Sequence, residues 1–245
     1  MTVIQEIRTA PRSAQIGLGV IGFYVGVAVF APLLAPYEET EVVGDVWEAC
    51  SRSALLGTDQ LGRDLLTRLL YGARNTVSIA LVTTLLAFTI GVVSGLSVAI
   101  ISGWLDTLLS WLVDILMAIP TLIFALILLS VLGTSIPTLI LVIAVLSATR
   151  VFRLSRAVAM DVTVMEFVEV AKLRGEGWWW ILRQEILPNT LAPLVAEFGL
   201  RFCFVFLFIS SLSFLGLGIQ PPTADWGSMV RENAGAIPFG LPTPF

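Results

Sequence analysis

Long apolar runs, separated by shorter polar stretches, dominate the pattern of this chain. A helix that crosses the hydrocarbon core of a bilayer needs about 20 predominantly apolar residues. Five runs predict such helices, at residues 16–35, 77–101, 106–132, 136–152 and 191–215. The predicted fold class is therefore an all-α integral membrane protein with five transmembrane helices. Pro120 lies inside the third run and predicts a kink there.

The polar stretches between these runs define the segments of the chain. We distinguish an N-terminal segment with the first transmembrane helix at 1–36, an extracytoplasmic loop at 37–76, a membrane core at 77–218 with a cytoplasmic loop at 153–190, and an extracytoplasmic tail at 219–245. The first apolar run is longer than the roughly 7–15 residues of a signal-peptide core, so we expect it to be retained.

Arginine and lysine residues set the expected orientation, because they are enriched in cytoplasmic loops. Alternation of five helices places Arg8, Arg12, Arg150, Arg153, Arg156, Lys172, Arg174 and Arg183 on one side, and Arg52, Arg63, Arg68, Arg74 and Arg231 on the other. The richer side is predicted to be cytoplasmic. The N-terminus is then expected in the cytoplasm and the C-terminus outside.

The composition supports a membrane protein and narrows the chemistry. Hydrophobic residues make up 57% of the chain and charged residues 13%, whereas a soluble domain has about 45–50% and about 25%. The net charge of −4 argues against a nucleic-acid partner. Histidine is absent, and Cys50 and Cys203 lie far apart in different kinds of segment. We therefore expect no metal site and no catalytic residue, which leaves a membrane enzyme with little support.

The polar loop after the fourth run has the pattern helix, break, helix. Thr163 and Glu166 fit a capping box that starts the first helix, and Asp161 is a competing cap. Gly175 stands where a helix ends with positive φ. A second short helix is predicted over 178–187, ended by Pro188. Such a segment is either a surface that another protein grips or an amphipathic connector lying on the membrane.

The same loop carries Glu169-Val170-Ala171, then Gly175, then Ile186-Leu187-Pro188. This arrangement resembles the EAA loop of bacterial ABC importer permeases, and the spacing from Gly to Leu-Pro matches. Two positions depart from the family pattern, because Val170 replaces an alanine and Glu185 occupies an isoleucine position.

Further motifs occur in an order that resembles the dipeptide, oligopeptide and nickel branch of those permeases. They are Leu56-Gly57-Thr58-Asp59, Leu61-Gly62-Arg63-Asp64, Tyr71-Gly72-Ala73-Arg74, Val113-Asp114-Ile115, Ala118-Ile119-Pro120, Ser213-Phe214-Leu215-Gly216-Leu217-Gly218, Gln220-Pro221-Pro222 and Asp225-Trp226-Gly227. Together they cover about residues 55–230. The resemblance implies a bacterial inner-membrane permease, and this family usually has six transmembrane helices. Residues 219–245 contain no further long apolar run that could form the sixth.

By this resemblance the chain is a non-catalytic transport subunit that imports peptides, nickel chelates or a related small solute. Its expected partners are a second permease subunit, two cytoplasmic ATPase subunits, an extracytoplasmic binding protein and the lipid bilayer. ATP and magnesium are expected on the ATPases and no cofactor on this chain. Glu169 and Ala171 are the predicted ATPase contacts, Gly175 the turn, and Leu187 and Pro188 the anchor of the second helix. The alternative is a secondary transporter or channel without ATP coupling.

The extracytoplasmic motif and the third run each leave two readings open. Gly57 and Gly62 predict tight turns, and Asp59, Arg63 and Asp64 either pair locally to hold the loop or face the binding protein. Within the third run, Asp114 either lines the transport pathway or bonds to a neighbouring helix, because a carboxylate in hydrocarbon requires a partner or water.

Other aromatic and charged residues can be interpreted as purely structural. Trp178, Trp179 and Trp180 are expected to anchor the loop at the membrane interface, where indoles concentrate, or to form an apolar grip on the ATPase. Glu197 and Arg201 are four residues apart and are predicted to pair with each other on one helix.

Overall fold

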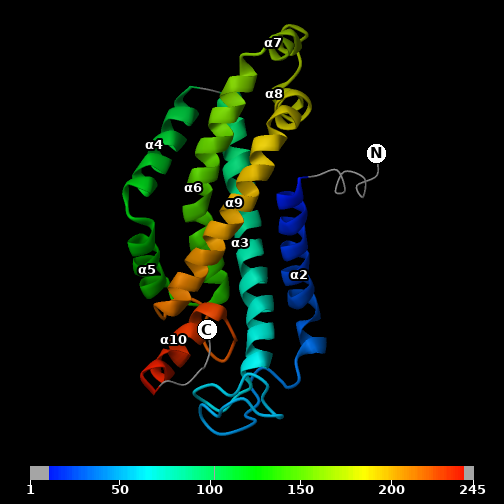
Figure 1. Cartoon of the computed structure of the whole chain (residues 1–245). Helices are drawn as coiled ribbons and strands as arrows, with labels where there is room; N and C mark the ends of the chain where they lie inside the picture. Colours follow the sequence, from blue (N-terminus) through cyan, green and yellow to red (C-terminus); the bar gives the residue numbers. More distant parts are fainter. Residues whose placement is uncertain (1–10, 102, 240–245) are drawn as a thin grey trace. The chain divides into compact units, whose positions relative to one another are not determined.

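The computed structural model describes residues 11–101 and 103–239, in which all regular structure is helical (Figure 1). The elements are α2 Arg12–Leu34, α3 Leu65–Ile101, α4 Trp104–Ala118, α5 Thr121–Leu132, α6 Ile136–Thr163, α7 Glu166–Leu173, α8 Trp178–Ile181, the π-helix η1 Leu182–Ile186, α9 Leu187–Phe214, α10 Trp226–Asn233 and the 3₁₀-helix η2 Ala234–Phe239. The all-α membrane fold is confirmed. Arg8, used above for orientation, lies outside the described residues.

The described residues contain four helices long and apolar enough to cross a membrane, and a fifth span results if the bent pair α4 and α5 counts as one. The pair bends by 91° at Pro120, where a kink was predicted. Ile119 is extended there, with φ −87° and ψ 132°. A proline disfavours α conformation in the residue before it, so the sequence dictates this break.

The chain divides into two compact units. One contains residues 79–212, and the other contains the described residues of 1–78 and 213–245. In the second of these units, α10 follows Asp225, whose side chain is the helix cap: Oδ2 accepts from the Ser228 amide at 2.9 Å, and Oδ1 accepts from the Thr76 hydroxyl at 2.9 Å. The carboxylate is fully buried and both its oxygens are engaged. It therefore ties α10 to the first part of α3.

In the unit of residues 79–212, α3 and α6 approach so closely that their contact permits only glycine. A Cβ added at Gly95 would lie 2.7 Å from the Phe152 carbonyl oxygen and 2.9 Å from Ser155 Cβ. A Cβ at Gly91 would lie 2.6 Å from Val151 Cβ. Small residues at this spacing let two membrane helices pack backbone against backbone.

Helix α6 is longer than its apolar run. The run was predicted to end near Phe152, but α6 continues to Thr163, so the polar stretch 153–190 begins inside a helix. The predicted capping box is wrong, because the Thr163 hydroxyl donates to the Met160 carbonyl within α6 and Met165 precedes α7. Hydropathy marks where a helix leaves the lipid, whereas the backbone pattern continues beyond that point.

Candidate functional site

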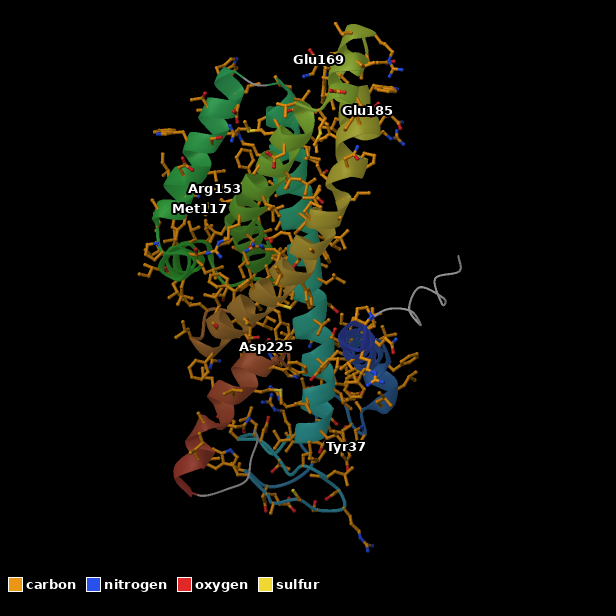
Figure 2. All side chains as sticks on the ribbon, turned by 45° about the horizontal axis from the view of Figure 1, so that its top comes forward. Tyr37, Met117, Arg153, Glu169, Glu185 and Asp225 are labelled. Carbon is orange, nitrogen blue, oxygen red and sulfur yellow. The ribbon has the colours of Figure 1, made fainter. Side chains whose placement is uncertain are left out.

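Helix α7 presents one buried face and one exposed face. Val168 and Ala171, three residues apart, are fully buried in a cluster with Leu96 of α3 and Ile186 of η1. Glu169 lies on the exposed side (Figure 2). Of the two predicted ATPase contacts, Glu169 is therefore accessible. Ala171 occupies a packing position that holds α7 in place.

The break after α7 has the geometry that Gly175 predicts. Its φ is +80°, its amide donates to the Lys172 carbonyl at 3.0 Å, and the Glu176 amide donates to the Ala171 carbonyl at 3.2 Å. These two bonds form a Schellman motif, which closes a helix through a residue in left-handed conformation. A Cβ built at Gly175 meets no atom within 4 Å. Glycine is favoured here by backbone conformation, and the space beside it is open to a partner.

The second helix begins at Trp178, as predicted, but Pro188 does not end it. The five-residue π-helix η1 joins α8 to α9, and the Leu187 amide donates to the Leu182 carbonyl, five residues earlier. Pro188 then stands in the first turn of α9, where its missing N–H costs little because the widened turn precedes it. The predicted helix over 178–187 is thus the beginning of one continuous helical segment that runs to Phe214.

The π-helix also accounts for the departure at Glu185. A π turn holds one residue more than an α turn, so it shifts the following side chains by one position. Ile186, and not residue 185, is fully buried in the cluster under α7. Glu185 is only half-buried, and Figure 2 shows it at the same end of this unit as Glu169. The apolar anchor of the loop is retained one residue later.

The three tryptophans extend the accessible surface beside this turn. Trp178, Trp179 and Trp180 are exposed by 50%, 58% and 37%, and the Arg174 guanidinium stacks 5.6 Å from the centre of the Trp180 ring. Together with Glu169 and Gly175 they form an exposed surface that is partly charged and partly aromatic. Whether membrane interface or protein covers the tryptophans stays a prediction.

The motif at residues 56–64 forms a folded loop with two glycine turns. Gly57 and Gly62 have φ of +82° and +76°, which confirms the predicted turns. A side chain at Gly62 would collide with the Gly44 carbonyl oxygen. Asp64 Oδ2 accepts from the amide and the hydroxyl of Thr67, at 2.8 and 2.7 Å, and so caps the start of α3.

A buried ion cluster joins this loop to α10. Asp59 Oδ2 lies 2.7 Å from Arg63 Nε and 3.3 Å from Arg68 Nε, and Glu232 Oε2 lies 3.3 and 3.2 Å from the Nη2 atoms of the same two arginines. The four side chains are at most 6% exposed. Two positive and two negative charges thus compensate each other away from water. The geometry supports local pairing that holds the loop, while docking of a binding protein stays a prediction.

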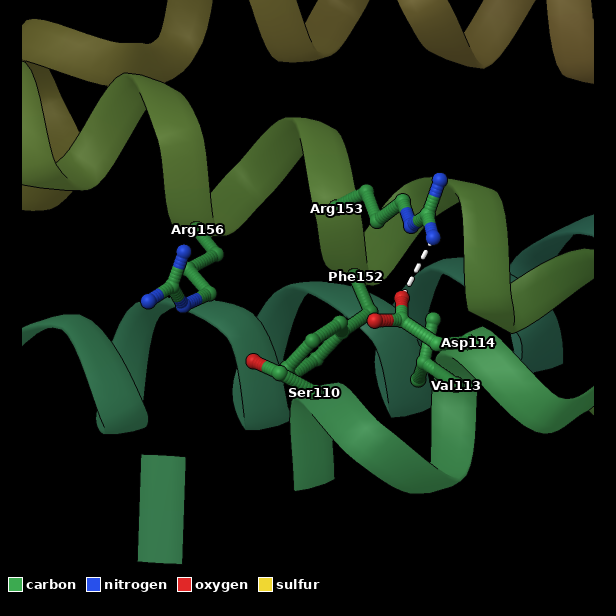
Figure 3. A pocket seen from close by; sticks show the side chains of 6 residues that line it. All are labelled: Ser110, Val113, Asp114, Phe152, Arg153 and Arg156. Carbon is green, nitrogen blue, oxygen red and sulfur yellow. Dashed lines mark hydrogen bonds and ion pairs between the residues drawn. The ribbon is translucent and has the colours of Figure 1, made fainter. Parts of the chain in front are cut away.

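Asp114 has the neighbouring-helix partner that one of its two interpretations predicted. Its Oδ1 accepts a hydrogen bond from Arg153 of α6, so it does bond to a neighbouring helix. It also lines a cavity of about 350 Å³ with Ser110, Val113, Phe152, Arg153 and Arg156 (Figure 3). One turn of α4 beyond Ser110, Asp106 pairs with Arg156. A role of Asp114 in transport stays a prediction.

On α9, the predicted pair of Glu197 and Arg201 is present: Arg201 Nε donates to Glu197 Oε1 at 3.0 Å. Sequence reasoning missed Glu232 and Arg153 as ion partners. Arg153 is separated from Asp114 by 39 residues and Glu232 from Arg63 by 169. Only a charge in an apolar run, such as Asp114, signals that some partner exists. The residues described contain no group of three or more His, Cys, Asp or Glu placed to hold a metal ion.

Comparison with known families identifies the class of protein. The family model described as binding-protein-dependent transport system inner membrane component matches residues 87–243. The model described as N-terminal TM domain of oligopeptide transport permease C matches residues 11–45. The chain therefore belongs to the family of inner-membrane components of binding-protein-dependent transport systems, and it is a permease subunit of an ABC importer.

Its relatives include peptide permeases from several bacteria. The chain is 36% identical to the dipeptide transport system permease protein DppC of Haemophilus influenzae, over 91% of this chain and 78% of that protein. It is 36% identical to the di/tripeptide transport system permease protein DppC of Pseudomonas aeruginosa, over 90% and 75%. It is 30% identical to the glutathione transport system permease protein GsiD of Pectobacterium atrosepticum, over 85% and 70%. A secondary transporter or channel is not favoured.

Proposed function

We propose that this chain forms half of the membrane pathway of an importer for short peptides. The dipeptide, tripeptide and glutathione permeases among its relatives support that solute class. A second permease subunit would complete the pathway, two cytoplasmic ATPases holding ATP and magnesium would drive it, and an extracytoplasmic binding protein would deliver the peptide. This chain itself performs no covalent chemistry, and its N-terminus lies in the cytoplasm.

The segment from α7 to η1 is the proposed ATPase-coupling site. The observation that carries the proposal is the Schellman turn at Gly175, which projects from a segment whose other face is buried. Glu169 contacts the ATPase, and the buried Ala171 holds α7 in the position that this contact needs. Leu187 and Pro188 connect the site to α9, so that movement of the turn is transmitted along a continuous helix. Closure of the ATPases then shifts the membrane helices as rigid bodies.

Replacement of Gly175 by arginine tests the coupling. Gly175→Arg is expected to abolish ATP-dependent uptake of a labelled dipeptide while the amount of subunit in the membrane is unchanged. The arginine side chain fills the space that a partner needs, and its Cβ is disfavoured by the left-handed backbone at this position. Uptake is measured in cells that express the complete importer.

Gly177→Ala is the matched control. Gly177 is two residues away, has φ −71° and meets no atom within 4 Å of an added Cβ, so its replacement leaves the turn intact. A photo-crosslinker placed at Leu173, which is 83% exposed, should capture an ATPase subunit. Normal uptake by a well-expressed Gly175→Arg subunit would refute the coupling site.

A further inference from the structure

Two ion pairs connect α4 to α6, and they differ in geometry and exposure. Both residues of one pair, Asp114 and Arg153, line the cavity. Arg156 donates to both carboxylate oxygens of Asp106, with Nη2 at 2.6 Å from Oδ2, and the side chains are 30% and 20% exposed. Arg153 donates a single hydrogen bond to Asp114, and these side chains are 50% and 59% exposed. The first pair is bidentate and closed. The second is open.

The open pair retains most of its hydrogen-bonding capacity. A guanidinium carries five N–H donors and a carboxylate about four acceptor sites. Within the described part of the chain, the shared bond is the sole hydrogen bond found for the side chains of Arg153 and Asp114. Figure 3 shows the two side chains facing each other at one end of the cavity, with Phe152 and Ser110 beside them.

The surroundings require water or a polar occupant at this place. Asp114 follows Val113 and precedes Ile115 on an apolar helix. An uncovered charge at the bilayer centre costs about 2.5–3.5 kcal/mol on insertion scales. Both side chains of the open pair are half exposed or more, so the pair leaves room for water or another polar occupant.

We propose that this cavity binds the two charged ends of a short zwitterionic peptide during its passage. Asp114 accepts from the ammonium group, Arg153 donates to the carboxylate, and Phe152 and Val113 contact apolar atoms of the peptide. The inference rests on the peptide class proposed above. A volume of about 350 Å³ lies at the small end of the range of roughly 300–1,000 Å³ for ligand pockets, which suits a dipeptide.

Charge complementarity favours a zwitterion over other solutes. When its ends enter between Arg153 and Asp114, the four charges alternate in sign, and the cavity keeps the net charge it had before. A peptide with a blocked terminus leaves one protein charge facing a neutral group and so loses one charge-assisted hydrogen bond. Arg156 stays engaged with Asp106 and limits the cavity at its other end.

Thiol protection in the assembled importer tests this site. The permease carries Cys50→Ser, Cys203→Ser and Ser110→Cys, and the complex is placed in nanodiscs, where both membrane faces are open to a membrane-impermeant maleimide. Ala-Ala is expected to slow labelling of the new thiol, and N-acetyl-Ala-Ala-amide is not. Asp114→Asn and Arg153→Gln should each raise the half-protecting Ala-Ala concentration by about tenfold or more, the loss of one charge-assisted hydrogen bond.

Controls separate binding from folding and from the peptide assignment. Arg153→Lys keeps the charge and should keep part of the protection. Arg52→Gln removes an exposed charge that does not line the cavity and should change nothing. An unreactive thiol at Ser110→Cys, equal protection by the blocked peptide, or full protection in Arg153→Gln overturns the site. If binding-protein-dependent dipeptide uptake persists in that case, only the cavity proposal fails and the proposed function stands.

Discussion

Single residues in the loop before α3 show how a motif that resembles a recognition surface can serve as a structural support. Asp59 accepts from the amides of Leu61 and Arg63 as well as from the Arg63 side chain, and it is fully buried. Its carboxylate therefore organises the turn and contacts two guanidinium groups at once. The net contribution of a buried ion pair to stability is small, but removal of one partner leaves the other charge unpaired and lowers stability strongly.

Asp59→Asn should destabilise the full-length chain by about 3–5 kcal/mol, the cost of breaking a buried ion pair by removing one partner. Arg63 and Arg68 would then share Glu232 alone. The thermal midpoint of the detergent-solubilised protein measures the effect, and limited proteolysis of residues 37–64 locates it.

Asp45→Asn is the matched control, because Asp45 is exposed and its carboxylate makes none of the hydrogen bonds found among the described residues. Equal midpoints for the two variants would show that the cluster does not support the loop.

At the level of helices, the contact between α3 and α6 is determined by the absence of side chains. Gly91 and Gly95 lie one turn apart on α3, and the atoms that an added Cβ would meet at Gly95 include backbone atoms of Phe152 and Arg156. Backbone atoms cannot rotate out of the way, so a methyl group forces the helices apart. The cluster under α7 includes Leu96, so this crossing also positions the proposed coupling segment.

Gly95→Ala is expected to lower the free energy of unfolding by about 1–3 kcal/mol, the usual range for overpacking, although alanine is the better helix former. The matched substitution Gly199→Ala on α9, where nothing lies within 4 Å of the added atom, should be neutral or stabilising. Unfolding in a detergent series with increasing sodium dodecyl sulfate measures both. A stabilising Gly95→Ala would contradict the close crossing.

For the whole molecule, α3 alone constrains the topology. Its 37 residues extend about 55 Å at 1.5 Å per residue, which exceeds the roughly 30 Å hydrocarbon core. We therefore expect its two ends to lie on opposite sides of the membrane. The loop before α3 contains the exposed Cys50, and by alternation the turn after α7 lies on the side of the C-terminal end of α3.

Impermeant thiol labelling in intact spheroplasts checks this topology. Native Cys50 should react from outside without permeabilisation. A cysteine at Leu173, in a Cys50→Ser and Cys203→Ser background, should react only after the cytoplasmic face is opened. Labelling of the Leu173→Cys variant in sealed spheroplasts would invert the orientation and remove the basis for ATPase coupling.

Sequence and tertiary structure answer different questions about this protein. Local properties of the chain predict the spans, the break at Pro120 and the left-handed turn at Gly175, because hydropathy, proline sterics and glycine conformation act within a few residues. The motif order also indicates the family. These local features do not depend on how distant segments of the chain pack.

Only the tertiary structure reveals that Arg153 pairs with Asp114, that Glu232 completes a cluster with Arg63, and that Ala171 is buried. Each depends on segments that are distant in sequence, and a charge does not encode which opposite charge it meets. The same holds for the end of α6. Packing of α7 against α3 and η1 stabilises the part of α6 that extends beyond the apolar run. Hydropathy records the preference of a residue for lipid, whereas partners and buried faces are decided by which helices come together.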